Sequence, residues 1–198
     1  RMLEHRCREL DVDVLRPWDL AVDAHRAAPI RPFRDSEEFM GTAARVFESV
    51  DGELGGHFRT MIEERLLDLE SRKGKAPGGY CETLHYRGRP FIFMNAVGLV
   101  DDVMTLLHEA GHAFHAFAAH AQPLIWQRHP GSEAAELASM SMELLAAPHL
   151  ARPTGFFDER DHLRAWLEHL EDVLLSLVHI ASVDAFQTWI YTSGEGGD

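Results

Sequence analysis

The chain has 198 residues, 26% of them charged, and a formal net charge of -13 at pH 7. Its length is enough to bury a hydrophobic core, as one domain or as part of a larger one. The acidic balance and the short apolar runs argue against nucleic acid and membrane partners, and two cysteines without a disulfide framework favour a reducing, cytoplasmic location.

Residues 1–34 predict the end of a helix followed by a connecting segment. Apolar side chains in residues 1–10 are spaced for one helix face, and three prolines in residues 11–34 favour irregular structure. We expect residues 35–191 to form the helical core, with residues 1–198 as one catalytic piece of a longer chain.

Two helices are predicted at the start of this core. Asp35 or Ser36 caps the first, and Glu38 has the spacing of a capping box. The second runs from about residue 54 to residue 71, because its leucines and other apolar residues recur at helical spacing and Gly74 suits the stop.

Two short strands follow, over residues 80–86 and 91–95, and residues 87–90 join them as a hairpin. Strand alternation places Phe93 and Asn95 on one face. The edge of strand 91–95 is expected to pair with an extended peptide backbone, although a purely structural sheet stays open as an alternative. Gly79, next to Tyr80, allows the backbone to turn or to approach a ligand closely.

The sequence His108-Glu109-Ala110-Gly111-His112 lies in a segment that predicts an unbroken helix over about residues 101–122. His108 and His112 are four residues apart and therefore share one face, where two imidazoles can bind one Zn²⁺. Glu109 is placed to take a proton from a zinc-bound water. The pattern therefore predicts a hydrolytic zinc site.

A hydrolytic zinc site of this type needs a third protein ligand and one open position. The downstream candidates are His115, His120, His129, Glu133, Glu136 and Glu143. Glu136 is favoured, because the small residues around it allow its helix, over residues 133–147, to approach closely. Glu143 is expected either to orient a zinc-bound histidine or to form a buried salt bridge.

A last long helix is predicted from Asp158 or Asp161 to about Tyr191. Leucine, valine and isoleucine recur along it at helical spacing and give it an apolar stripe.

These motifs together resemble the oligoendopeptidase F family, with thimet oligopeptidase as a more distant relative. The resemblance is carried by five segments: 75–81, 91–95, 108–115, 135–143 and 184–191. It implies a mainly α, thermolysin-like zinc core with a small hairpin or sheet before the metal helix. It also implies that His108, His112 and Glu136 bind one Zn²⁺, that Glu109 is the base, and that Gly79, Tyr80, Phe93 and Asn95 bind substrate.

The expected reaction is hydrolysis of internal bonds in short peptides. Family members are about three times longer, and the resemblance implies that the residues that stabilise the oxyanion lie outside this chain. The piece alone is therefore expected to bind zinc and cleave poorly. A zinc carboxypeptidase or dipeptidyl carboxypeptidase of related architecture and a non-catalytic zinc or peptide-binding domain remain as alternatives, and the oligomeric state stays open.

Overall fold

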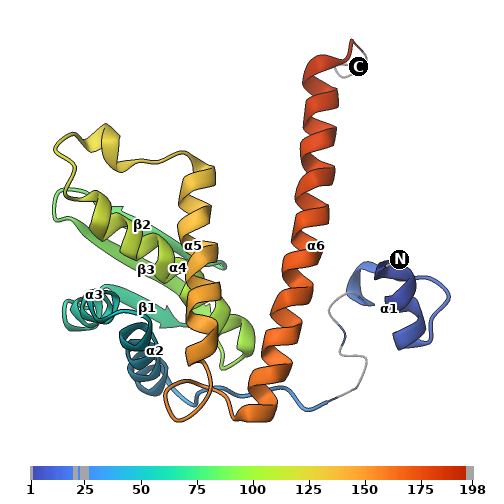
Figure 1. Cartoon of the computed structure of the whole chain (residues 1–198), viewed down its shortest axis with the longest axis horizontal. Coiled ribbons are helices and arrows are strands. Elements are labelled where there is room, and N and C mark those ends of the chain that lie inside the picture. The colour runs from blue at the N-terminus through green and yellow to red at the C-terminus, as the bar shows by residue number, and fades with distance from the viewer. Residues whose placement is uncertain (1, 20–21, 23–26, 195–198) are drawn as a thin grey trace. The chain divides into compact units, whose positions relative to one another are not determined.

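A computed structural model of the chain describes residues 2–19, 22 and 27–194 (Figure 1). The chain divides into two units, Arg1–Ile30 and Arg31–Asp198. The first contains α1 (Met2–Leu10) and the short 3₁₀ helix η1 (Pro17–Asp19). The second contains α2 (Ser36–Val50), α3 (Gly52–Glu63), β1 (Leu67–Glu70), β2 (Tyr80–Leu84), β3 (Arg89–Ala96), α4 (Val100–Ala119), η2 (Ile125–Arg128), α5 (Ser132–Ala146), η3 (Ala147–His149) and α6 (Glu159–Thr192). The predicted mainly helical fold with a small sheet before the metal helix is confirmed.

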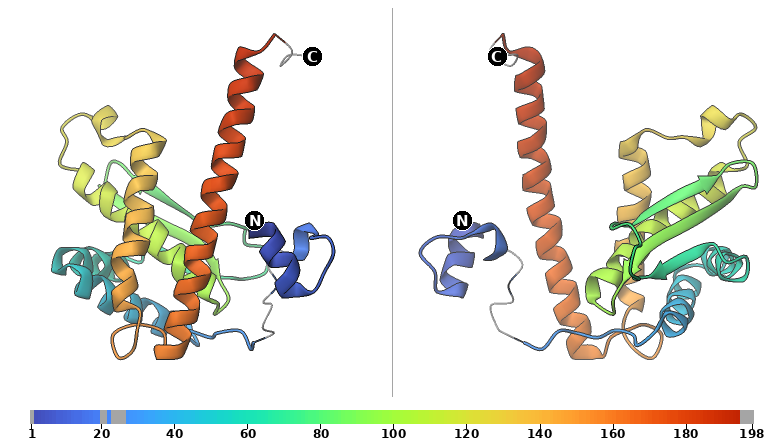
Figure 2. Two further views of the ribbon diagram at one scale, coloured as in Figure 1. Left: turned by 45° about the vertical axis from the view of Figure 1, so that its right-hand side comes forward. Right: turned by 180° about the vertical axis from the view of Figure 1, so that it is seen from behind.

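The sheet has the strand order β1-β3-β2, in which β1 is parallel and β2 antiparallel to β3. The predicted hairpin is therefore present, and Figure 2 shows the sheet from a second side. However, β3 is the central strand and its backbone is paired on both sides. The prediction that strand 91–95 offers a free edge to a peptide is wrong, because the unpaired edges of the sheet belong to the outer strands, β1 and β2.

The second predicted helix ends earlier than expected, and its last turn is replaced by β1. Arg65 has a φ of 57°, in the left-handed region, so the helix cannot continue through it. The leucines at positions 67 and 69 alternate with acidic residues, which suits a strand with one buried face. The sequence pattern also predicts a buried helix face for these leucines, because a run of four residues is too short to separate the helical from the strand period.

Aromatic side chains join α2, α3 and α4 into one core. Phe47 of α2 and Phe58 of α3 are fully buried, with ring centroids 4.8 Å apart, and Phe114 of α4 meets Phe47 edge to face at 5.0 Å. Asp35 caps α2 as predicted, with its Oδ1 accepting a hydrogen bond from Glu38 N at 2.8 Å. This packing holds α4 against α2 and α3.

Helix α6 differs from the others. It begins after Asp158, whose Oδ1 accepts a hydrogen bond from Asp161 N, as predicted. Its apolar stripe, however, is exposed: Leu167, Leu174 and Leu177 each keep more than half of their surface. In length and composition α6 could cross a membrane, although helices of soluble proteins can meet the same test. This qualifies the expectation that no segment reaches membrane-spanning length.

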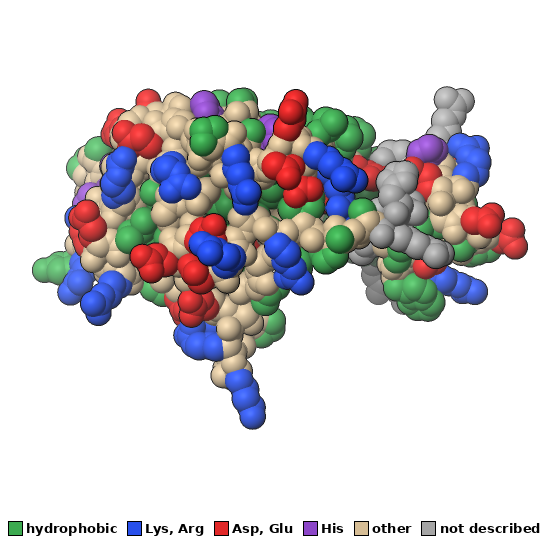
Figure 3. Space-filling model, turned by 90° about the horizontal axis from the view of Figure 1, so that it is seen from below, with side chains coloured by type: hydrophobic (Ala, Val, Ile, Leu, Met, Phe, Trp, Pro, Cys, Tyr) green, Lys and Arg blue, Asp and Glu red, His purple; other side chains and the backbone are tan. Residues whose placement is uncertain are grey.

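The surface charges are mixed in sign. On the face in Figure 3, lysine and arginine side chains alternate with aspartate and glutamate. The net charge of -13 does not form one uniformly acidic field on this face.

Candidate metal centre

Helix α4 carries the predicted metal-binding motif and is held at both its start and its sides. Asp102 Oδ2 accepts hydrogen bonds from the backbone N–H groups of Val97 at 2.8 Å and Leu99 at 2.7 Å, which closes the turn between β3 and α4. The helix then packs against the sheet and α5. The two histidines of the motif therefore project from a helix with little freedom to move.

The three predicted ligands meet. His108 Nε2 lies 3.2 Å from Glu136 Oε2, and His112 Nε2 lies 3.7 Å from the same oxygen. The ring centroids of the two histidines are 4.9 Å apart. Three ligand atoms at about 2.0–2.1 Å from a tetrahedral Zn²⁺ would lie about 3.4 Å from one another. The side chains therefore fit a zinc ion with only small adjustments.

Close packing of α4 against α5 brings Glu136 to the histidines. A Cβ at Gly111 would lie 2.6 Å from Ser139 Cα and 2.7 Å from Ala138 O, so only glycine fits at this crossing. Ser139 is fully buried, and its hydroxyl donates to Glu136 Oε2 at 3.0 Å. The small residues of α5 act as predicted, while Gly111 and the Ser139 hydrogen bond were not foreseen.

Glu109 is next to the ligands but outside the group that could hold a metal. Its side chain is buried, with 8% of the residue exposed. Burial raises the pKa of Glu109, and the carboxylate of Glu136 raises it further, while His108 and a hydrogen bond from the Cys81 backbone lower it. A carboxyl group with a raised pKa is suited to accept and return a proton near neutral pH.

Glu143 lies behind the first histidine of the motif. Its Oε1 is 2.7 Å from His108 Nδ1, so Nδ1–H can donate to the carboxylate while Nε2 faces the metal position. This hydrogen bond raises the pKa of His108. This geometry supports the predicted role of Glu143 in orienting a ligand, and its contacts with His108 and His169 also have the distances of the salt bridge predicted as the alternative.

The other candidate ligands lie elsewhere. Among the described residues, the only group of three or more that could share a metal ion is His108, His112 and Glu136. Glu133 is exposed in the first turn of α5, and its Oε2 lies near Gly131. His120 contacts Arg128, with 3.1 Å between His120 Nδ1 and Arg128 Nη1. His115 and His129 line a neighbouring cavity.

The predicted substrate residues mainly support the start of β2. Tyr80 and Phe93 stack with centroids 5.0 Å apart, while their neighbours Cys81 and Ile92 face the α4 side of the sheet. Alternation along the strands therefore directs Tyr80 and Phe93 away from the metal helix. Asn95 Nδ2 donates to Ala76 O and Gly78 O, each at 2.9 Å.

Gly79, the fourth predicted substrate residue, packs against the metal helix. A Cβ at this position would lie 3.2 Å from Thr105 Cγ2. The glycine thus allows the start of β2 to approach α4, and the structure assigns it no contact with the metal-binding group.

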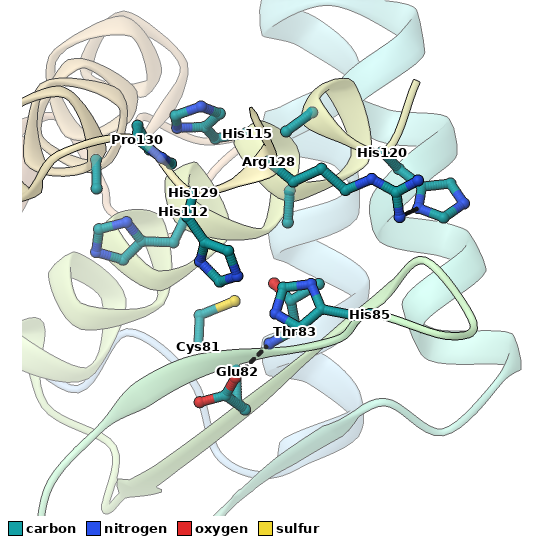
Figure 4. A pocket seen from close by; sticks show the side chains of 13 residues that line it. Cys81, Glu82, Thr83, His85, His112, His115, His120, Arg128, His129 and Pro130 are labelled. Atoms are coloured by element: carbon teal, nitrogen blue, oxygen red, sulfur yellow. Dashed lines mark hydrogen bonds between the residues drawn. The ribbon is translucent and has the colours of Figure 1, made fainter. Parts of the chain in front are cut away.

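A cavity of about 270 Å³ opens between β2 and the C-terminal half of α4. Figure 4 shows Cys81 and His85 on the strand side, with His112 and His115 above them. Arg128, at the end of η2, and the next two residues, His129 and Pro130, also line the cavity. Of the three candidate ligands, His112 lines this cavity, so the cavity adjoins the candidate metal centre on the His112 side.

Comparison with known proteins places these features in a family. The model of peptidase family M3 matches residues 8–198. The chromosomal oligoendopeptidase F of Lactococcus lactis subsp. cremoris is 32% identical over 114 residues, which are 56% of this chain and 18% of that protein. An oligoendopeptidase F homolog of Lactococcus lactis subsp. lactis (strain IL1403) is 31% identical over 170 residues, which are 84% of this chain and 28% of that protein.

A solved structure has the same fold. The structure described as PZ peptidase A with inhibitor 2 superposes with a TM-score of 0.84 and 34% identity, over 96% of this chain and 33% of that chain. The present chain thus spans about a third or less of each of these relatives.

Proposed function

Because the chain belongs to peptidase family M3, we propose that the protein is a zinc metalloendopeptidase that hydrolyses internal bonds of short peptides. The observation that carries this proposal is the convergence of His108, His112 and Glu136 beside the buried carboxyl of Glu109. A structural zinc site has no need of a base in this position, which favours an enzyme over a non-catalytic zinc or peptide-binding domain.

Zinc bound by these three ligands would supply a Lewis acid for the scissile carbonyl and would lower the pKa of a water molecule to about 7. Glu109 takes the proton from the attacking water and passes it to the leaving amine. Burial of Glu109 raises its pKa and so makes its carboxylate a stronger base for the first of these transfers. Glu143 keeps His108 in the tautomer that presents Nε2 to the metal.

The free edge of β2 is the proposed site for the substrate backbone. Ile92 N–H donates to Leu66 O on the β1 side, so Ile92 and its partner Cys81 form a pair without mutual hydrogen bonds. Cys81 therefore directs its backbone groups to the free edge, where its N–H reaches Glu109. A peptide added along this edge would pass the base and the cavity.

Groups that stabilise the oxyanion are proposed to come from sequence outside residues 1–198, as the resemblance implies. Loss of such a donor can cost about 10²–10³ in rate. A short peptide is the proposed substrate, and the cytoplasm is the proposed location. The unpaired state of Cys7 and Cys81 is compatible with that location.

A peptide blocked at both ends tests this function. The full-length protein should cleave it internally, and a chelator should stop the reaction. Glu109→Gln should still bind zinc and lose activity by about 10²–10⁴, whereas His179→Ala, on the exposed part of α6, should behave as the wild type. Cleavage of peptides only when their C-terminus is free would indicate a dipeptidyl carboxypeptidase, and undiminished turnover by Glu109→Gln would refute the assigned mechanism.

A further inference from the structure

Helix α6 has 34 residues, and only two of those described are buried, Ala165 and His169. An alanine in a helix contact is ordinary, because it allows close approach. A histidine buried to 8% exposure on a helix whose leucines are exposed is not explained by the hydrophobic effect. Its polar contacts therefore define what it does.

His169 faces the carboxylate that orients the first metal ligand. Its Nε2 lies 3.4 Å from Glu143 Oε2, while the other oxygen of Glu143 lies 2.7 Å from His108 Nδ1. Within the described part of the chain the buried His169 Nε2 makes no hydrogen bond, and Glu143 Oε2 is the carboxylate oxygen recorded within ion-pair distance of it. The ring also packs on Trp166, with centroids 5.4 Å apart.

We infer that His169 is a positioning residue for the metal centre, which fixes Glu143 by holding its second oxygen. The inference rests on the proposed zinc site. A glutamate carboxylate rotates easily about its last torsion, for which the energy wells are broad. Donors on both oxygens fix its plane, and the oxygen facing His108 then keeps that imidazole in the orientation that binds metal. His169 thereby links α6 to a site built otherwise from α4 and α5.

Asp172 is the rival partner for His169. It lies one helical turn further along α6, and its charge is close enough to interact with that of His169. Asp172 is exposed, however, and no hydrogen bond between the two is present in the described structure. If His169 served only to hold Asp172, changing His169 would leave zinc binding unaffected.

The test is the zinc dissociation constant of the full-length protein, measured by competition with a chelator. Glu143→Ala should weaken zinc binding by about 10- to 100-fold, and His169→Ala by about tenfold. Because His169 acts through Glu143, the double variant should bind zinc no more weakly than Glu143→Ala alone. The inference would be overturned if His169→Ala still weakened zinc binding in the Glu143→Ala background. It would also be overturned if the single variant His169→Ala bound zinc within twofold of the wild type.

Two conservative variants separate positioning from packing. The amide nitrogen of His169→Gln reaches about as far as Nε2 and should restore most of the affinity, whereas His169→Asn places its amide nearer Nδ1 and should not. Asp172→Asn and His179→Ala are matched controls on α6, and both should bind zinc like the wild type. Equal loss in the Gln and Asn variants would contradict the role.

The outcome is separable from that of the proposed function. A protein that loses zinc affinity on His169→Ala but cleaves no blocked peptide would refute the peptidase and keep the positioning role. If the protein cleaves the peptide and His169→Ala leaves the zinc dissociation constant unchanged, only the positioning role is refuted.

Discussion

The core formed by α2 to α5 and the sheet differs from α6 in what happens to apolar side chains. Phe39, Phe47 and Phe58 are fully buried in the core, whereas Leu177 and Phe186 of α6 keep 56% and 57% of their surface. Both regions have apolar residues at helical spacing. An amphipathic pattern therefore identifies the apolar face of a helix that is suited to pack against other residues. In the described part of the chain, this face is buried in the core helices and largely exposed on α6.

The two regions also divide the chemistry. All three candidate metal ligands and the base lie in the core, on α4 and α5. Helix α6 contributes a single buried polar side chain, His169, which reaches the site through Glu143. We therefore expect mutations in the core to change the free energy of unfolding whether or not further chain is present. Mutations on α6 should change it only where other residues pack on this helix.

Truncation of a large apolar side chain to alanine should lower the free energy of unfolding much more in the core than on α6. Phe47→Ala removes a fully buried ring and should lower the free energy of unfolding of this 198-residue chain by about 3–5 kcal/mol. Leu174→Ala removes a side chain that is 53% exposed and should change it by less than about 0.5 kcal/mol. Urea denaturation measures both, and equal losses would show that the α6 stripe is buried.

The same leucine tests what covers α6 in a longer protein. If further chain packs on the stripe, Leu174→Ala should cost about 2–5 kcal/mol in the full-length protein. If Leu174→Ala changes the stability of neither the 198-residue chain nor the full-length protein, the apolar stripe of α6 stays exposed to solvent in both.

The crossing of α4 and α5 should be the next most sensitive point. Gly111→Ala forces a Cβ against the backbone of Ser139, so it should destabilise the chain by about 1–3 kcal/mol and weaken zinc binding by displacing Glu136. Gly41→Ala, in α2 with nothing within 4 Å of the added Cβ, should stabilise by about 0.5–1 kcal/mol. Thermal unfolding with and without zinc checks both variants.

The sheet should show a stability loss of similar size at Lys75, whose side chain is 1% exposed. Its Nζ donates to Asp68 O at 2.9 Å and Glu70 O at 2.8 Å, which ties the loop before β2 to β1. Lys75→Met should lower stability by about 1.5–3 kcal/mol, while Lys73→Met, at an exposed position, should have almost no effect. A tolerated Lys75→Met would show that the loop is held by other contacts.

The smallest expected effect is a dependence of stability on acid. Hydrogen bonds from Arg72, and then from Lys75, lower the pKa of Asp68 to about 2. The contribution is therefore fully present above the unfolded pKa of about 3.9 and is lost as the pH falls through about 2. It should amount to about 1 kcal/mol or less. Denaturation between pH 5 and pH 2 should show a weaker pH dependence in Asp68→Asn than in the wild type.

Much of the core could be predicted from sequence because the signals were local. Asp35 and Asp158 each accept a hydrogen bond from the backbone N–H three residues later, which is the local pattern of a helix cap. His108 and His112 share a helix face because they are four residues apart. Glu136 could be selected because small residues surround it, and Gly111 in the motif itself would have been a further signal for a close helix crossing.

The missed features depend on long-range contacts. The four residues of β1 satisfy both helical and strand spacing, and only pairing with β3 decides between them. Which strands lie at the edges of the sheet depends on strand order, which short-range patterns do not determine. His169 is one of 13 histidines, and nothing in its neighbourhood along the chain indicates that Glu143 lies beside it.

Anomalous scattering at the zinc absorption edge tests the central claim most directly. Crystals grown with zinc should show one strong peak about 2.0–2.1 Å from His108 Nε2, His112 Nε2 and Glu136 Oε2. The peak should remain in Glu109→Gln, because Glu109 is not a ligand in this account. A peak held instead by His115 or Glu133, or no peak between these three side chains, would contradict it.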